Sequence, residues 1–271
     1  ARARQGDAPV EPPGPRSMLD RLVRGRLVGR HQELAEARRL WRLATEGTTQ
    51  VLLISGEPGT GKTRMARELG SQVAVTGGLV LAGECFAEGG APYAPLVPVL
   101  HQALTRLAGT PQGVPPFILP DLVRLAPSLQ ALHPDIPPRP PGEPAVDQHQ
   151  LCESAAHLFS ALSRHVPLLL ILEDAHWADG GTLRILGHIV HRARVPGMRL
   201  LAVLTYREIE LDEARALRDL LQELNRERRA LRLKLPRFDR PQTGAMLSTM
   251  FQEDIAPEFL EGVYRETDGN P

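Results

Sequence analysis

Lysine is nearly missing from this 271-residue sequence, which holds 32 basic residues but only two lysines, Lys62 and Lys234. Basic and acidic residues balance at 32 each, so the chain lacks the excess positive charge of dedicated nucleic-acid-binding proteins. Cysteine is also rare. Cys85 and Cys152 show no metal-ligand spacing, and we expect reduced, half-buried thiols.

Long apolar runs and a signal peptide are absent as well. No stretch of 18 apolar residues occurs in the sequence, so it predicts no membrane-spanning helix. We therefore expect a cytoplasmic protein whose partners include neither a membrane nor, directly, a nucleic acid.

Short apolar runs alternate with longer amphipathic stretches along most of the chain, which is the pattern of an α/β fold. Strands separated by helices favour right-handed crossovers and a parallel sheet. The sequence therefore predicts a three-layer αβα architecture around a mainly parallel five-stranded sheet. The five predicted strands lie at residues 50–55, 79–85, 167–173, 199–207 and, as an edge strand, 230–236.

Three further segments frame this core, which we expect to span residues 27–237. Residues 1–26 predict a linker or disordered lead-in, because proline is frequent and no apolar periodicity occurs. Residues 109–145 predict a proline-rich insertion over the sheet, with one helix at 119–132. Residues 238–271 are purely helical in pattern and predict the start of a small helical lid. We expect the chain to be part of a longer protein.

The segment "GEPGTGKT" (56–63) follows a predicted strand and precedes a predicted helix, the context that a phosphate-binding loop requires. Glycines at Gly56, Gly59 and Gly61 let backbone amides turn toward the phosphates. Lys62 supplies a positive charge to the β- and γ-phosphates, and Thr63 offers a hydroxyl to Mg²⁺. The loop makes the predicted core a P-loop NTPase fold with ATP or ADP and Mg²⁺ as its ligands.

An acid pair ends the most apolar predicted strand, "PLLLILE" (167–173), where Glu173 is followed by Asp174. The carboxyl ends of parallel strands are where α/β proteins bind ligands. We expect one acid to hold the metal and the other to polarise the attacking water, with the assignment of each role left open. The guanine-reading pattern Asn-Lys-x-Asp is absent, so adenine is the favoured base.

Other polar residues are better explained by structure than by chemistry. Four histidines, His101, His157, His188 and His191, fall on predicted helices without an acid at useful spacing, and we interpret them as structural. The basic run at 225–234 contains a glutamate and no aromatic residues, so it predicts a solvated helix end.

Four segments stand in an order that resembles a known family: "LVGRHQELAEARRL" (27–40), the phosphate loop, "LLLILEDAHWADGGTLRIL" (168–186) and "LLAVLTYRE" (200–208), followed by "YRETDGNP" (264–271). Together they resemble the ATPase module of the STAND class, the signal-transduction ATPases with numerous domains. The likeness is greatest to modules of large bacterial transcriptional regulators and of multidomain adenylate/guanylate cyclases or kinases.

The resemblance implies roles for individual residues. The "VGR" segment would pack on the adenine side, Arg207 would read the γ-phosphate as a catalytic sensor, and Pro271 would bring the lid against the base. His176 and Trp177 match the family's tail without an assigned role, with packing favoured for Trp177, and Asp179 is a candidate helix cap. The predicted nucleotide contacts are Val28, Gly29, Arg30, Gly56, Pro58, Gly59, Thr60, Gly61, Lys62, Thr63, Arg64 and Pro271.

The resemblance also implies a slowly hydrolysing, Mg²⁺-dependent ATPase that acts as a nucleotide-dependent switch. Its partners would be adenine nucleotide and the effector and output domains of the same longer chain, with nucleotide-driven self-association as a further partner interaction. The alternatives are an AAA+ remodeller or DNA-loading ATPase that cycles as an oligomer, and a nucleotide-binding scaffold without hydrolysis. Intact Lys62, Thr63, Glu173 and Asp174 argue against the scaffold.

Overall fold

The computed structural model describes residues 27–88, 90–110, 113–131, 134–137, 139–192 and 197–271. The predicted lead-in at 1–26 lies outside the described residues. Two compact units make up the rest. We call Arg30–Arg237 with Asn270–Pro271 the core unit, and 27–29 with Phe238–Gly269 the helical unit.

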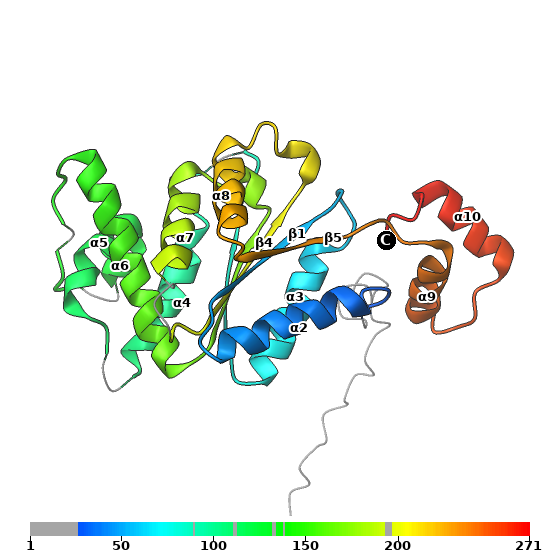
Figure 1. Cartoon of the computed structure of the whole chain (residues 1–271), viewed down its shortest axis with the longest axis horizontal. Helices are drawn as coiled ribbons and strands as arrows, with labels where there is room; N and C mark the ends of the chain where they lie inside the picture. Colours follow the sequence, from blue (N-terminus) through cyan, green and yellow to red (C-terminus); the bar gives the residue numbers. More distant parts are fainter. Residues whose placement is uncertain (1–26, 89, 111–112, 132–133, 138, 193–196) are drawn as a thin grey trace, which may run out of the picture. The chain divides into compact units, whose positions relative to one another are not determined.

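The elements follow the predicted alternation closely (Figure 1). In chain order they are α2 His31–Thr45, β1 Gln50–Ser55, α3 Lys62–Val75, β2 Leu79–Glu84, α4 Leu96–Ala108, η1 Pro116–Ile118, α5 Leu119–Leu125, η2 Pro127–Ala131, α6 Pro144–His165, β3 Leu168–Glu173, η3 Ala175–Trp177, α7 Gly180–Arg192, β4 Leu200–Tyr206, η4 Glu208–Glu210, α8 Arg215–Arg226, β5 Ala230–Lys234, α9 Arg240–Phe251 and α10 Pro257–Thr267.

The described strands form one five-stranded sheet in the order β2-β3-β4-β1-β5, and every neighbouring pair is parallel. The predicted parallel sheet is thus confirmed. β3 and β4 are buried along their whole length, because helices cover both of their faces and their sequences are apolar except at their carboxyl ends. β2 and β5 alternate between more and less buried positions, as expected of the two edge strands.

Helices cover the sheet on both sides within the core unit (Figure 1). α2 and α3 pack on each other and on the central strands. α4 packs on β2, and α6, α7 and α8 pack side by side on the opposite face of the sheet. One continuous apolar cluster fills the space between the sheet and the second layer. The three-layer αβα architecture is therefore confirmed, and it aligns the carboxyl ends of β1, β3 and β4 at one edge.

The proline-rich region differs from its prediction in two respects. The single helix predicted at 119–132 is two elements, α5 and η2, because Pro127 lacks a backbone N–H and disfavours a helical conformation at Ala126. The region packs mainly against α6 and not over the sheet. Its buried apolar side chains, including Ile118, Leu122 and Leu129, join the main core cluster.

The helical unit consists of α9 and α10, which pack on each other, together with residues 27–29. Asp239 caps α9 in a capping box: its side chain accepts a hydrogen bond from the Gln242 N–H, and the Gln242 side chain accepts one from the Asp239 N–H. The Phe238 N–H donates to the Gly269 carbonyl at 2.7 Å, which joins the two ends of the helix pair.

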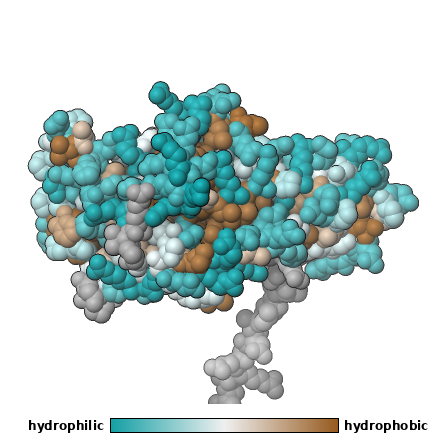
Figure 2. All heavy atoms as spheres, in the orientation of Figure 1, coloured by the Kyte–Doolittle hydropathy of each residue, from teal (hydrophilic) through white to brown (hydrophobic). Residues whose placement is uncertain are grey.

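The surface in Figure 2 is mostly hydrophilic, with apolar areas between the polar ones. Phe86, Phe117 and Ile209 are among the large apolar side chains that are exposed. Among the helices that the structure describes, none combines the length and the apolar character needed to cross a bilayer.

Both cysteines are free thiols, and both are buried, more fully than expected. Burial, together with the negative charges of Asp179 and Asp174, raises the pKa of the Cys85 thiol to about 12. Since the thiolate is the reactive form, we expect Cys85 in the Cys152→Ser variant to react with a thiol reagent at pH 8 on the order of a thousandfold more slowly than free cysteine. Unfolding in guanidinium should restore the rate, and fast reaction of the native protein would contradict the prediction.

Candidate functional site

The carboxyl ends of β1, β4 and β3 lie side by side and carry most of the predicted site residues. Ser55 at the end of β1 pairs with Tyr206 at the end of β4, and Leu204 pairs with Leu172 of β3. This register places three segments at one edge of the sheet: the phosphate loop, Arg207 and the acid pair. The predicted catalytic residues are thereby brought together, although Lys62 is more than 100 positions before the others in the sequence.

The loop at 56–61 depends on glycine at two of its positions. At Gly56 a β-carbon would lie 2.8 Å from the Leu235 carbonyl oxygen and 2.7 Å from Thr60 Oγ1, so a side chain does not fit. At Gly61 the backbone has φ +90°, and a β-carbon would meet nothing within 4 Å, so the loop faces open space there. Thr60 Oγ1 donates to the Glu57 carbonyl at 2.9 Å and closes the turn.

Helix α3 begins at Lys62, immediately after Gly61, without a side-chain cap. The first N–H groups of a helix have no partner within the helix, and together with the helix dipole they attract anions. Neither an acid in the first turn nor a capping side chain competes for these groups. The start of α3 therefore suits a phosphate group.

The Lys62 side chain is 7% exposed and lies along the loop. Its Nζ donates to the carbonyls of Glu57 at 2.8 Å and Gly56 at 3.1 Å. Burial lowers the pKa of Lys62 below its ordinary value, while the nearby charge of Asp174 acts in the opposite direction. The ammonium group thus lies inside the loop and within electrostatic reach of the acid pair.

The two acids of the pair have different surroundings. Glu173 is buried, and it accepts two hydrogen bonds from Arg67 of α3, at 3.2 Å from Nε and 3.5 Å from Nη2. Asp174 is half-buried and adopts a left-handed backbone conformation (φ +51°), and its N–H donates to Thr205 Oγ1 at 2.9 Å. The sequence analysis missed both Arg67 and Thr205, because neither lies near the acids in the sequence.

Arg207 follows β4 and makes two contacts. Its Nη1 donates to Glu210 Oε1 at 2.7 Å, and its guanidinium carbon lies 4.7 Å from the centre of the Trp177 ring. The second carboxylate oxygen of Glu210 lies 3.1 Å from His176 Nε2. Glu210 was also missed, although its spacing of three residues from Arg207 is a signal that the sequence contains.

The remaining predicted contacts divide between the two units. Val28 and Gly29 belong to the helical unit, where the Gly29 carbonyl accepts a hydrogen bond from Gln242. Arg30 is buried in the core unit and donates to the Pro236 carbonyl and, at 3.4 Å, to the Thr60 carbonyl.

Four predicted contacts remain in the core unit. Pro271 belongs to this unit, and its neighbour Asn270 lies against Gly59. Pro58 is exposed on the loop, whereas Thr63 and Arg64 are half-buried in the first turn of α3.

The predicted cap of α7 is confirmed. Asp179 Oδ1 accepts from the N–H groups of Gly181 at 2.9 Å and Thr182 at 3.0 Å. Its other oxygen accepts from the Tyr93 N–H at 3.1 Å, which ties the α7 start to the segment before α4. Trp177 packs against the core cluster, in agreement with its predicted packing role.

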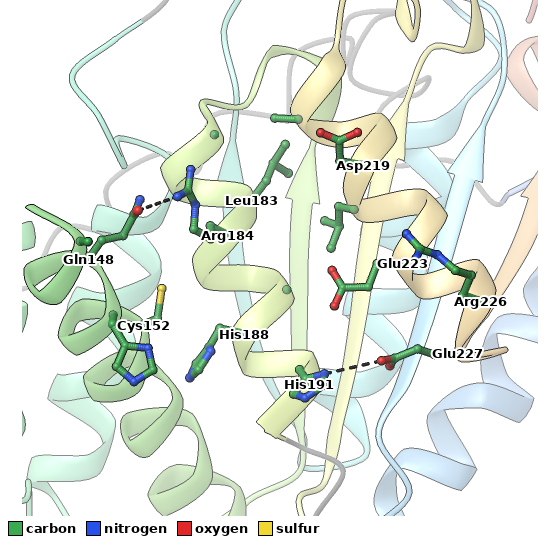
Figure 3. A pocket seen from close by; sticks show the side chains of 16 residues that line it. Gln148, Cys152, Leu183, Arg184, His188, His191, Asp219, Glu223, Arg226 and Glu227 are labelled. Atoms are coloured by element: carbon green, nitrogen blue, oxygen red, sulfur yellow. Dashed lines mark hydrogen bonds and ion pairs between the residues drawn. The ribbon is translucent and has the colours of Figure 1, made fainter.

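A groove of about 950 Å³ lies between α6, α7 and α8, away from the phosphate loop (Figure 3). Donor atoms of His191, Glu223 and Glu227 lie within 4.8 Å of one another there. His191 is 3.6 Å from Glu227, which is itself 3.7 Å from Arg229. These ion pairs account for the arrangement, since Glu227 caps the end of α8 and Glu223 lies one helical turn before it. We assign the trio to the contact between α7 and α8.

The prediction that the helical histidines lack acid partners is wrong for three of the four. His188 Nε2 lies 2.8 Å from Glu153 of α6, and His157 lies 3.9 Å from the same carboxylate, four positions earlier in its own helix. His191 contacts Glu227 as described above. Packing of α6 against α7 supplies the first partner, which helical spacing in one segment does not reveal.

Known proteins resemble this chain in family and in fold. A family model described as AAA ATPase domain matches residues 26–204. A comparison with curated proteins found no match. Among solved structures, the Orc2 protein of Aeropyrum pernix in ADPNP and ADP complexes is 19% identical, with a TM-score of 0.50 over 86% of this chain and 55% of that one. The Cdc6p protein of Pyrobaculum aerophilum is 16% identical, with a TM-score of 0.49 over 85% and 51%.

The chain spans about half the length of these solved structures. The likeness to Orc2 concerns the fold, which is the five-stranded parallel sheet with its flanking helices. The family match covers most of the chain and includes the phosphate loop, the acid pair and most of β4. The chain therefore belongs to the AAA ATPase domain family.

Proposed function

We propose that the chain is the ATPase module of a STAND-class switch, which binds ATP or ADP with Mg²⁺ and hydrolyses ATP slowly. The observation that carries the proposal is the meeting of Lys62, the acid pair and Arg207 at one edge of the sheet. This combination provides a phosphate cradle, a metal and water site, and an arginine that can respond to the third phosphate.

The residues present fit a magnesium-bound nucleotide. Thr63, Glu173 and Asp174 offer the hard oxygen ligands that Mg²⁺ prefers. The phosphate loop excludes side chains at Gly56 and opens at Gly61, where α3 begins. When bound, Mg²⁺ would neutralise charge that develops on the β- and γ-phosphates.

Each residue of the site has a role in this proposal. Lys62 exchanges its two loop carbonyls for phosphate oxygens, and the amides at the start of α3 bind the same anion. One acid of the pair orients the metal, while the other polarises the water that attacks the γ-phosphate. Arg207 stabilises negative charge on that phosphate. Adenine would be recognised on the side of Val28, Gly29 and Arg30, with Pro271 closing over the base.

A switch and a fast-cycling remodeller differ in how long each nucleotide state lasts. In a switch, effector and output domains of a longer chain would respond to which nucleotide is bound. A remodeller or DNA-loading ATPase would instead turn over continuously as an oligomer. Membership in the AAA ATPase domain family accommodates both classes. Arg207 follows the strand next to the one that carries the acid pair, and this placement supports the switch.

We expect steady-state ATP turnover by this chain to be slow, at about one per minute or less, the range of intrinsic switch NTPases. ADP should remain bound after the reaction when the protein is passed through a desalting column. The Lys234→Ala variant, which removes the lysine outside the phosphate loop, is the control and should turn over ATP at the same rate. Turnover near the enzymatic median of about ten per second, accompanied by oligomers in light scattering, would favour the remodeller.

A further inference from the structure

We propose that Glu210 is a latch on Arg207 that the γ-phosphate of ATP must displace, and that His176 and Trp177 are positioning residues for this latch. The inference rests on the proposed function and extends it to the way in which ATP is distinguished from ADP. It also gives a role to the "HW" of "EDAHWAD", which the phosphate chemistry leaves without one.

The latch contact is short and partly sheltered from water. Arg207 Nη1 and Glu210 Oε1 are 2.7 Å apart, and each side chain is only about one quarter exposed. Both residues belong to one short turn, because Arg207 precedes η4 and Glu210 ends it. A carboxylate and a γ-phosphate are chemically similar partners for a guanidinium group, so they compete for the same donor.

His176 lies on the other side of the Glu210 carboxylate. Its side chain is fully buried, and its Nε2 lies 3.1 Å from Glu210 Oε2. With one oxygen facing Arg207 and the other facing His176, the carboxylate has a defined orientation. Burial lowers the pKa of His176, so its imidazole is neutral, and it makes no hydrogen bond to Glu210. After Arg207 turns toward a phosphate, water can solvate the Glu210 carboxylate, because its side chain is 28% exposed.

Trp177 supports Arg207 from a different direction. The guanidinium carbon lies 4.7 Å from the ring centre, within the range of a cation–π contact, and the Trp177 ring packs against His176 at 4.5 Å between ring centres. η3 places both rings directly after Asp174, since the Trp177 N–H donates to the Asp174 carbonyl at 2.9 Å. The acid strand and the sensor arginine are thus joined through three consecutive residues.

ATP and ADP should therefore differ at Trp177. A γ-phosphate withdraws Arg207 from the ring, whereas ADP has no group that competes with Glu210. Trp41 of α2 is the other tryptophan of the sequence, so Trp41→Phe leaves Trp177 as the single tryptophan, whose emission can be excited selectively. We expect a non-hydrolysable ATP analogue with Mg²⁺ to shift the emission of this variant, and ADP with Mg²⁺ to leave it unchanged, with the binding of both measured by calorimetry.

Glu210→Gln tests the competition directly. We expect it to tighten binding of the ATP analogue by about three- to tenfold, because the neutral amide holds Arg207 less strongly than the carboxylate does, while ADP affinity stays within about twofold. Asp212→Asn is the matched control, since it removes an acid two residues away whose side chain is 99% exposed. Equal changes in both nucleotide affinities would show an ordinary structural contact and overturn the latch.

Trp177 variants provide a second test. Trp177→Leu should tighten binding of the ATP analogue and spare ADP, because Arg207 loses a contact that it makes only in the latched state, and Trp177→Phe should restore most of the original affinity by replacing the aromatic face. If Trp41→Phe fails to fold, the two resonances of fluorotryptophan in the unsubstituted chain give the same readout. Binding of both nucleotides without any selective response at Trp177 would overturn the latch alone. Absence of nucleotide binding would overturn the proposed function and the latch together.

Discussion

Lys62→Ala is expected to weaken ATP and ADP binding by about a hundredfold or more. The ammonium group has two close carbonyl partners in the loop and is shielded from water by burial. A charged hydrogen bond in such a place contributes about 1.5–3 kcal/mol, so the loss of two such bonds to phosphate exceeds the 2.7 kcal/mol or so that corresponds to a hundredfold.

The chain supplies its own control for this experiment. Lys234 lies on edge strand β5, is 69% exposed at its side chain and pairs with Glu208 at 2.7 Å. Lys234→Ala removes the same group and should leave nucleotide affinity within about twofold. Calorimetric titration of both variants measures their nucleotide affinities, and circular dichroism verifies that both are folded. Full affinity in Lys62→Ala would remove this lysine from the site.

The second large effect concerns the acid pair. We expect Glu173→Gln and Asp174→Asn each to keep ATP affinity within about threefold and to slow hydrolysis by about a hundredfold or more, the usual contribution of a positioned acid or base. Both substitutions preserve side-chain shape and the hydrogen bonds that an oxygen can accept. Binding depends mainly on the loop and on Lys62, whereas bond cleavage depends on the carboxylate charge.

The surroundings of the two acids give each substitution its own signature. Against the effect of burial, the negative charge of Asp174 raises the pKa of Lys62 and so acts at the phosphate site. A metal titration of Asp174→Asn should show whether Mg²⁺ binding there is weakened. Glu173 is bound to Arg67, and its neighbour in the sheet register is Glu84 of β2. Glu84→Gln is therefore a matched control one strand away and should hydrolyse ATP normally. Normal hydrolysis by both acid variants would place the reaction elsewhere.

The strands and the phosphate loop could be predicted because their signals are local. A largely apolar run such as 168–173 is buried whichever strands it pairs with. A glycine-rich turn between a strand and a helix has few conformations other than that of a phosphate-binding loop. Parallel pairing then brings the acid pair to the loop without further information. The cap formed by Asp179 has the same local origin, since the N–H groups that donate to it lie two and three residues ahead.

Partners contributed by other elements could not be predicted from the same patterns. Arg67 reaches Glu173 from α3, and Glu153 reaches His188 from α6, at separations that depend on how the helices pack. The break at Pro127 had a local signal that the apolar periodicity outweighed. Polar contacts between elements are the part of a site for which one sequence holds the least information.

The register of the central strand has a consequence for how the protein is made. Gln50 of β1 pairs with Leu201 of β4, and on its other side β1 pairs with β5, which begins at Ala230. About 150 residues must be synthesised before the first of these neighbours exists, which at ~5–20 residues per second takes roughly ten seconds. During that interval the apolar strand ahead of the phosphate loop has no sheet neighbour, and its unpaired edges are open to aggregation until β4 has been made.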